Sequence, residues 1–343
     1  ACNLACSYCY TGKKFQRPMS AQTGRRAIRR AIASLSPSGH LNLGFFGGEP
    51  LIEAERISEW MEDARELGQA RGAKVSFGLT TNGTIRTEGA YELLLHPELD
   101  IAVSHDGLPE VHDAHRKDRK GQGTSETVER TIRELVACEK GFRVVMVVRP
   151  DTASRMTEGI NHLHALGVQS IDLTLDVWAH WSESEIASLE RNVRGCAQIW
   201  RADLRDLRIN WFDEKLAGFL PDKVNGSARC GFGKGEIAVA PSGNLYPCER
   251  LIGEDGKHNG MRLPGHVVEG EDFLDVLGPT HFRHEGCATC LMQECCNTTC
   301  KCNNFVRTGD PNRLDRLLCV LNRICLEEVS KVVSKSLDVR FVH

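Results

Sequence analysis

The sequence predicts an α/β fold built around a parallel sheet. Over the first half of the chain, short apolar runs of strand character alternate with longer runs of helical periodicity. Such alternation is typical of βα units, whose strands run parallel. Three motifs, GGEP, TTNGT and SHDG, each follow a predicted strand. Ligands bind at the carboxyl ends of parallel strands, so these motifs are expected to form a site there.

The individual elements follow from local patterns. Ser20 is a suitable N-cap, and Ala27, Ile28, Ala31 and Ile32 recur behind it at helical spacing. The predicted strands are 41–46, 74–80, 99–104, 142–148 and 170–176. The helices that separate them are predicted at 54–70, 87–95, 124–139 and 155–166.

The second half of the chain differs from the first in its cysteine content and in its pattern of predicted elements. Residues 181–220 are expected to be helical and connecting, whereas 235–248 predicts a hairpin that turns at 241–244. Ten of the fifteen cysteines lie from Cys230 onward. These shifts divide the chain into an α/β domain (1–180), a helical connector (181–229) and a cysteine-rich domain with a hairpin and helices (230–343).

Composition excludes several classes of protein. Lys plus Arg number 43 and Asp plus Glu 46, so no global positive charge favours nucleic acid or anionic lipid as a partner. No apolar run approaches the ~18 residues of a membrane span. The fifteen cysteines stand in spaced clusters within 343 residues. This spacing favours metal sites in a reducing compartment over a disulfide scaffold and predicts a cytoplasmic protein.

The opening cysteines, Cys2, Cys6 and Cys9, stand at the spacing C-x3-C-x2-C. A structural zinc site needs four ligands, and the nearest histidine in sequence is His40. A cubane iron–sulfur cluster has four irons, so three thiolates leave one iron open to a substrate. A zinc knuckle or three core cysteines remain the alternatives.

This pattern, with an aromatic residue before its last cysteine, resembles that of the radical S-adenosylmethionine (radical SAM) superfamily. The resemblance implies a partial (β/α)6 TIM-like barrel. In that family a first strand precedes the cysteine motif, and this sequence, which starts at Ala1 without a methionine, is expected to lack that strand. It also implies that SAM binds the open iron and is cleaved reductively to a 5′-deoxyadenosyl radical, which abstracts a hydrogen atom from substrate.

The strand-end motifs also resemble family segments, and the resemblance implies their contacts. Glu49 would bind the SAM ammonium, while the glycines before it would let backbone approach the ligand. Ser104 would bond the ribose, Asn82 and Asp106 would shape the pocket, and Tyr8 would flank the adenine. The cofactor-binding candidates are therefore Tyr8, Gly47, Gly48, Glu49, Asn82, Ser104 and Asp106. Ordinary turn and packing roles remain open for all of them.

The later cysteines resemble the seven-cysteine SPASM domain, which binds two auxiliary [4Fe–4S] clusters. The resemblance assigns Cys230, Cys248 and Cys300 to one cluster. It assigns Cys287, Cys290, Cys296 and Cys319 to the other. The protein would then hold three [4Fe–4S] clusters and SAM. The fourth ligand of the first auxiliary cluster stays open, with Asp222, water or substrate as candidates, and a zinc ribbon is the alternative.

Glu249 directly follows Cys248. Relatives that mature sulfatases carry an acidic base at the equivalent position, usually aspartate. The resemblance makes Glu249 a candidate catalytic base that takes a proton when a substrate radical is oxidised. A surface pair with Arg250, or a bond to cluster sulfur, would be the structural alternative.

The function that these patterns favour is radical SAM modification of a peptide. The product would be a cross-link, thioether or oxidation in a ribosomal precursor peptide, with flavodoxin or ferredoxin as reducing partner. One alternative is an anaerobic sulfatase maturase that forms formylglycine. The absence of an additional cysteine before Cys230, and Glu249 in place of aspartate, weigh against it. A non-catalytic iron–sulfur or zinc-binding protein is the alternative from another class.

Overall fold

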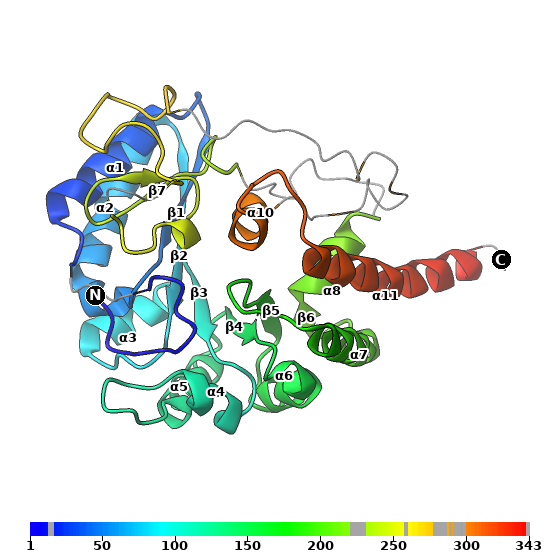
Figure 1. The fold of residues 1–343 in the computed structure, drawn as a ribbon. Coiled ribbons are helices and arrows are strands. Elements are labelled where there is room, and N and C mark those ends of the chain that lie inside the picture. Colours follow the sequence, from blue (N-terminus) through cyan, green and yellow to red (C-terminus); the bar gives the residue numbers. More distant parts are fainter. Residues whose placement is uncertain are drawn as a thin grey trace. The chain divides into compact units, whose positions relative to one another are not determined.

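The computed structural model describes most of the chain (Figure 1). The described residues are 1–12, 17–219, 231–256, 260–276, 287, 290, 296 and 300–340, the last range without the side chains of 335–340. The chain divides into two compact units that interleave along the sequence. The first comprises residues 1–104, 115–142 and 231–280, and the second comprises 105–114, 143–230 and 281–343.

Three parallel strands form the sheet of the first unit. They are β1 (His40–Phe45), β2 (Lys74–Thr81) and β3 (Leu99–Ser104). β2 lies between the other two strands. Its Leu79 pairs with Phe45 of β1, and its Thr81 pairs with Val103 of β3. Their carboxyl ends therefore lie at one edge of the sheet, where GGEP, TTNGT and SHDG begin.

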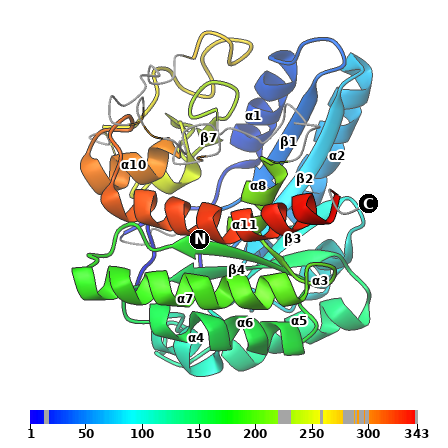
Figure 2. The same cartoon turned by 90° about the vertical axis from the view of Figure 1, so that its right-hand side faces the viewer.

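Helices cover this sheet at the positions that the periodicity predicts. α1 (Ala21–Ala33) begins after Ser20, whose side chain accepts a hydrogen bond from Thr23 N. α2 (Ala54–Arg71) lies alongside α1 and contacts β2, as Figures 1 and 2 show. α3 (Glu88–Leu95) and α5 (Ser125–Ala137) follow β2 and β3, and a 3-10 turn, η1 (Pro50–Glu53), follows GGEP.

The predicted hairpin is confirmed in the first unit. β7 (Ala238–Val239) pairs antiparallel with β8 (Leu245–Tyr246). Gly243 in its turn has φ +90°, and a Cβ there would come within 2.4 Å of the His266 ring. Only glycine meets both demands, which accounts for the glycine five residues before Cys248. The turn η3 (Glu249–Leu251) follows directly.

The second unit also contains three parallel strands. β4 (Phe142–Val148, which starts at the end of the first unit) pairs with β5 (Ser170–Leu175), and β5 pairs with β6 (Arg208–Ile209). The helices between them are α6 (Met156–Ala165), preceded by η2 (Ala153–Arg155), and α7 (Glu183–Ala202). α4 (Pro109–His115) precedes them in the chain, and α8 (Asn210–Ala217) follows β6.

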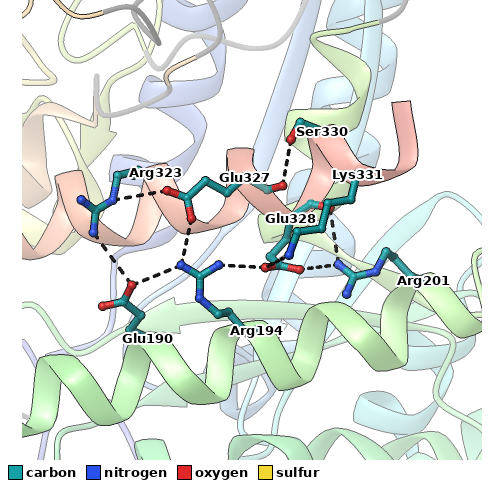
Figure 3. A network of polar contacts seen from close by, with 8 residues as sticks. All are labelled: Glu190, Arg194, Arg201, Arg323, Glu327, Glu328, Ser330 and Lys331. Carbon is teal, nitrogen blue, oxygen red and sulfur yellow. Dashed lines mark hydrogen bonds and ion pairs between the residues drawn. The ribbon is translucent and has the colours of Figure 1, made fainter. Parts of the chain in front are cut away.

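The C-terminal helices of this unit are α10 (Lys301–Thr308) and α11 (Arg316–Arg340). α11 lies along α7 and α8 (Figure 2). Glu328 on α11 is 2% exposed at its side chain and accepts hydrogen bonds from Arg194 and Arg201 of α7 and from Lys331 (Figure 3). Burial alone would raise the pKa of Glu328, but these cations outweigh it and lower that pKa. The network therefore fixes α11 to α7 through buried charge.

The structure confirms an α/β fold with parallel strands, and every predicted strand lies within two residues of an observed one. Two elements were not indicated by the sequence. β6 has only two residues and falls in the segment predicted as connector, and α4 covers part of a polar stretch. Among the described residues, no helix combines the length and apolarity that crossing a membrane would need.

Candidate functional site

The three opening cysteines lie on a loop that the rest of the first unit holds in place. Leu4 is 2% exposed and forms an isolated antiparallel bridge with Asp118. On either side of it, the backbone N–H of Ala5 donates to Lys117 O at 2.8 Å and that of Ser7 donates to His115 O at 3.0 Å. Arg119 donates to the carbonyl of Cys2. The segment 115–119 therefore sets the path of the cysteine loop.

The same loop is also fixed to the carboxyl ends of β1 and β2. Asn82 donates from Nδ2 to Asn3 Oδ1 at 2.9 Å, and Asn3 donates in turn to Thr84 Oγ1 at 2.7 Å. Ala1 O accepts from Glu49 N at 2.8 Å. Gly48 has φ +57°, and a Cβ there would lie 2.0 Å from Ala1 O. The glycine thus permits a close approach of backbone to backbone beside the cysteine loop.

Glu49 is deeply buried, with 2% exposure. Its Oε1 accepts from Leu51 N at 3.0 Å and from Thr81 Oγ1 at 2.7 Å, and its Oε2 accepts from Asn82 N at 2.6 Å. Burial nevertheless raises the pKa of Glu49 from 4.5 to about 7, because these neutral donors only partly offset the loss of hydration. No cation is among the groups that set this pKa.

Two tyrosines lie close to the cysteines. Tyr8 is half-buried, with its ring 5.8 Å from that of His115 and the Arg116 guanidinium 5.3 Å from its centroid. Tyr10 stacks on Phe46, with ring centroids 6.2 Å apart. The pKa of Tyr10 is raised well above 10, first by burial and then by the negative charges of Glu249, Cys9 and Cys248.

The surroundings of Tyr10 bring two parts of the sequence together. Cys9 belongs to the opening loop, whereas Cys248 and Glu249 end the hairpin segment. All of them act on Tyr10, so the candidate base stands close to the opening cysteines within the first unit. Cys248 itself lies 3.4 Å from Glu249 Oε2.

The buried carboxylate of Asp255 organises the hairpin beside Cys248. Asp255 accepts from Asn244 Nδ2 at 2.9 Å and from the Tyr246 hydroxyl at 3.0 Å. It also pairs with Arg17 at 2.6 Å, which lies between the opening loop and α1. Asp255 thus orders both ends of the hairpin turn and the chain that leads from the cysteine loop to the first helix.

Two further predicted contacts follow β3. Ser104 is the last residue of β3 and is 8% exposed. Asp106 belongs to the second unit, is 2% exposed and accepts from Val147 N at 3.1 Å through Oδ1. Its own N–H donates to His112 Nδ1 at 3.4 Å. The carboxylate of Asp106 therefore braces the backbone of β4, and its predicted role toward SAM stays a prediction.

Four of the later cysteines gather in the second unit. The pKa of Cys319, near the start of α11, is raised first by burial and then by Cys296, Cys287, Asp315 and Cys290. These are the four cysteines that the SPASM resemblance assigns to one cluster. In the other predicted set, Cys300 is the N-cap residue of α10, with its sulfur 3.3 Å from that of Cys302, and Cys248 belongs to the first unit. Cys230 lies outside the described residues.

The donor geometry can be compared with what a metal group needs. Zn–S bonds of about 2.3 Å bring the thiolates of one zinc ion to within about 4 Å of each other. Within the described ranges, no group of three or more Cys, His, Asp or Glu side chains could hold a metal ion. Cys2, Cys6 and Cys9 are instead half-buried on one fixed loop. Three thiols on one loop match the number of thiolates that the predicted cluster with one open iron would need.

Sequence reasoning missed several residues of this edge. The sequence patterns assign no role to Tyr10, which follows Cys9, or to Arg119, which lies among the basic residues of 116–120. Their contacts join residues more than a hundred positions apart, such as Arg119 with Cys2 and Tyr10 with Glu249. The basic residues of 116–120 were the one visible signal for the former, and nothing in the spacing indicated the latter.

Comparison with known proteins gives the family. A profile of the Radical SAM superfamily matches residues 1–163. A serine-type anaerobic sulfatase-maturating enzyme of Klebsiella aerogenes is 27% identical over 318 residues, which cover 88% of this chain and 77% of that protein. A cysteine-type anaerobic sulfatase-maturating enzyme of Clostridium perfringens is 22% identical over 325 residues, which cover 88% and 86%.

Solved structures share the fold. The structure of anSMEcpe with bound AdoMet matches with a TM-score of 0.78 and 19% identity, covering 98% of this chain and 96% of that one. SuiB of Streptococcus suis bound to precursor peptide SuiA matches with a TM-score of 0.65 and 15% identity, covering 92% and 73%. Both comparisons extend through the cysteine-rich segment as well as the sheet.

Fold, opening cysteines and family profile agree on the class of protein: the chain carries a radical SAM domain over residues 1–163. It is a radical SAM enzyme, for which the superfamily implies a [4Fe–4S] cluster and SAM. Its particular relatives include anaerobic sulfatase maturases, and its structural neighbours include a protein solved with a precursor peptide. The family prediction from the sequence is thereby confirmed.

Proposed function

We propose that this enzyme cleaves SAM reductively and uses the 5′-deoxyadenosyl radical to abstract a hydrogen atom from a peptide. The modification would be a cross-link, thioether or oxidation in a ribosomal precursor peptide. The observation that carries the proposal is the opening loop, whose three half-buried thiols are held at the carboxyl edge of the sheet by backbone and side-chain hydrogen bonds. Peptide complexes of two structural neighbours support the substrate class.

In this proposal Cys2, Cys6 and Cys9 hold the cluster, and Glu49 binds the ammonium of SAM. The cluster, when bound, supplies the electron for reductive cleavage. Glu49 offers a buried carboxylate whose described partners are all neutral donors, so an ammonium would add the missing opposite charge. Gly48 and Asn82 keep that carboxylate and the cysteine loop together.

We also propose a SPASM domain with two auxiliary [4Fe–4S] clusters over residues 230–343, after a radical SAM domain (1–180) and a connector (181–229). One cluster would be held by Cys287, Cys290, Cys296 and Cys319. This assignment is supported by the effect of the first three thiols on the fourth, because each of them raises the pKa of Cys319. Cys230, Cys248 and Cys300 would hold the other. A flavodoxin or ferredoxin would supply electrons, as expected in the cytoplasm.

Glu249 is the proposed catalytic base. Its support is its position beside Cys248 and its electrostatic effect on Tyr10, the residue that follows Cys9. We expect Glu249→Gln to lower the ratio of modified peptide to 5′-deoxyadenosine by about a hundredfold, the usual weight of general base catalysis. Glu271→Gln, at a side chain 90% exposed in the same unit, is the matched control and should keep the ratio. An unchanged ratio in Glu249→Gln would remove it from the mechanism.

A second function has specific support. The relatives named above are anaerobic sulfatase maturases, and they align over 88% of this chain. Formylglycine formation from cysteine would release the sulfur, whereas formylglycine formation from serine, like a thioether or carbon cross-link, removes two hydrogens. Mass spectrometry of a peptide encoded beside the gene and co-expressed with the enzyme, before and after labelling with a hydrazide that reacts only with an aldehyde, separates formylglycine from a cross-link.

The proposed function as a whole is tested by SAM cleavage. Anaerobically loaded enzyme should contain about twelve irons per chain and release 5′-deoxyadenosine after dithionite reduction. A protein that binds zinc, or that loads iron but never releases the nucleoside, would contradict the proposal.

A further inference from the structure

The segment that follows β5 buries one tryptophan and exposes another. Trp181 is 5% exposed, and its indole N–H donates to Asp176 O at 3.0 Å. Trp178, three residues earlier, is 43% exposed. Trp181 thus forms a small core for the segment 176–181, while a large aromatic surface is left in contact with water beside it.

The backbone N–H groups around Trp178 are held from one side. Asp176 Oδ1 accepts from Trp178 N at 3.1 Å and from Ala179 N at 3.2 Å. Asp176 is itself 4% exposed, pairs with Arg149 at the end of β4, and donates from its backbone N–H to Val148 O at 2.8 Å. The segment is therefore attached to the carboxyl ends of two neighbouring strands.

The carbonyl groups that flank Trp178 are held from the other side. Arg307 of α10 donates from Nη1 to Val177 O at 3.3 Å and to Ala179 O at 2.8 Å. Its Nε lies 3.3 Å from Asp315 Oδ1. Asp176 and Arg307 thus hydrogen-bond the backbone on both sides of Trp178. Because this backbone is already ordered, binding a ligand there would cost little conformational entropy.

This position lies where a ligand is expected. The segment starts at the carboxyl end of β5, the edge at which parallel α/β folds bind ligands. Arg307 stands seven residues after Cys300, the N-cap of α10, or roughly 10 Å along the helix axis at 1.5 Å per residue. The exposed tryptophan is therefore tied to the same short helix that carries a predicted ligand of an auxiliary cluster.

We propose that Trp178 is the aromatic anchor for the peptide substrate. This inference rests on the proposed peptide-modifying function and names a residue of the second unit that would bind the substrate. An exposed tryptophan on an ordered backbone gives a large apolar contact at low entropic cost, which is the property of binding hot spots. A peptide needs such a fixed contact because its backbone must be ordered before one side chain meets the radical.

The probe for the test is a random linear peptide library, displayed on messenger RNA and selected against the cluster-loaded wild-type enzyme with SAM. The best selected peptide is then titrated, by fluorescence anisotropy, against wild type and variants. We expect Trp178→Ala to raise its Kd at least about tenfold and Trp178→Phe to raise it less. Leu204→Ala, at an apolar side chain 44% exposed before β6, is the matched control and should leave Kd unchanged.

The outcomes separate this inference from the function beneath it. Equal Kd values for wild type and Trp178→Ala would overturn the role of Trp178 while leaving a peptide-binding enzyme in place. Selection of no peptide by wild type would overturn the peptide function, and this inference with it. The thermal unfolding midpoint of Trp178→Ala should match that of wild type, because Asp176 and Arg307 hold the backbone. A lowered midpoint with a raised Kd would assign the effect to lost structure and refute the anchor.

Discussion

Replacing Glu49 with glutamine is expected to destabilise the protein at about pH 5 and to have little effect at about pH 8. Glu49 accepts from Leu51 N and Thr81 Oγ1 through one oxygen and from Asn82 N through the other. At about pH 5 the folded protein holds Glu49 protonated, and its hydroxyl oxygen can still accept a hydrogen bond, whereas the amide NH2 of a glutamine can only donate and must face a backbone N–H. One buried N–H then loses its acceptor, which costs about 1–3 kcal/mol.

The pH dependence follows from the raised pKa. Glu49 ionises at about 7 in the folded protein, against 4.5 as its ordinary value. The pKa of Glu49 is higher in the folded state than in the unfolded state. Protonated Glu49 therefore stabilises the folded protein fully below pH 4.5, and this stabilisation is lost as the pH rises toward 7. The loss amounts to about 3 kcal/mol, since each tenfold difference in proton affinity between the folded and unfolded states is worth about 1.4 kcal/mol. Glutamine does not titrate, so only the wild type loses this stability.

The measurement is the free energy of unfolding in urea, taken at several pH values between about 5 and 8 for wild type and variant. The gap between them should shrink with rising pH and close or change sign near pH 8. Glu55→Gln, at an exposed carboxylate of α2, is the matched control and should show no such trend. A gap that stays constant with pH would show that Glu49 does not titrate as its burial requires.

Three further outcomes test other parts of the fold. Gly48→Ala should lower the iron occupancy and should lower the stability by about 1–3 kcal/mol, because the added Cβ would lie 2.0 Å from Ala1 O. Gly47 also has a positive φ, but a Cβ there meets nothing within 4 Å, so Gly47→Ala is the control. An equal loss of iron in both variants would refute the close-approach argument. Glu328→Gln should cost about 2–4 kcal/mol in urea unfolding at neutral pH, and because the pKa of Glu328 is lowered, this gap should shrink below pH 4.5; a gap that persists in acid would contradict it. Cys6→Ala should remove about four irons per chain by elemental analysis, and retention of all iron would exclude Cys6 as a ligand.

The sequence predicted the helices and strands whose formation depends on neighbouring residues. Alternating apolar runs placed all five longer strands, and Ser20 was identified as a helix cap by its residue type alone. The hairpin turn at Gly243 followed from turn chemistry. β6 escaped because two residues, Arg208 and Ile209, carry no periodicity, and its place is set instead by pairing with β5.

The same contrast between local pattern and long-range contact holds for the candidate site. The cysteine spacing indicated the cofactor chemistry, since the ligands of the opening loop lie within eight residues of each other. The side chains that fix this loop could not be read in the same way. Arg119 reaches Cys2, and Asn82 reaches Asn3, only after the sheet has formed. Long-range contacts of polar side chains have no period, so the sequence offers no pattern that predicts them.

The two buried glutamates of this protein differ in a way that bears on function. Glu328 is surrounded by Arg194, Arg201 and Lys331, and its pKa is lowered. Glu49 has comparable burial, but only neutral donors contribute to its pKa, which is raised to about 7. A carboxylate that only anchors a loop gains from a resident cation, as Glu328 does. In the proposal that Glu49 binds the SAM ammonium, its carboxylate would take that opposite charge from outside the chain. An ammonium ligand bound there would lower the pKa of Glu49 and release a proton, so SAM should bind more tightly as the pH rises through about 7. Binding that is independent of pH across this range would instead assign Glu49 to the fold alone.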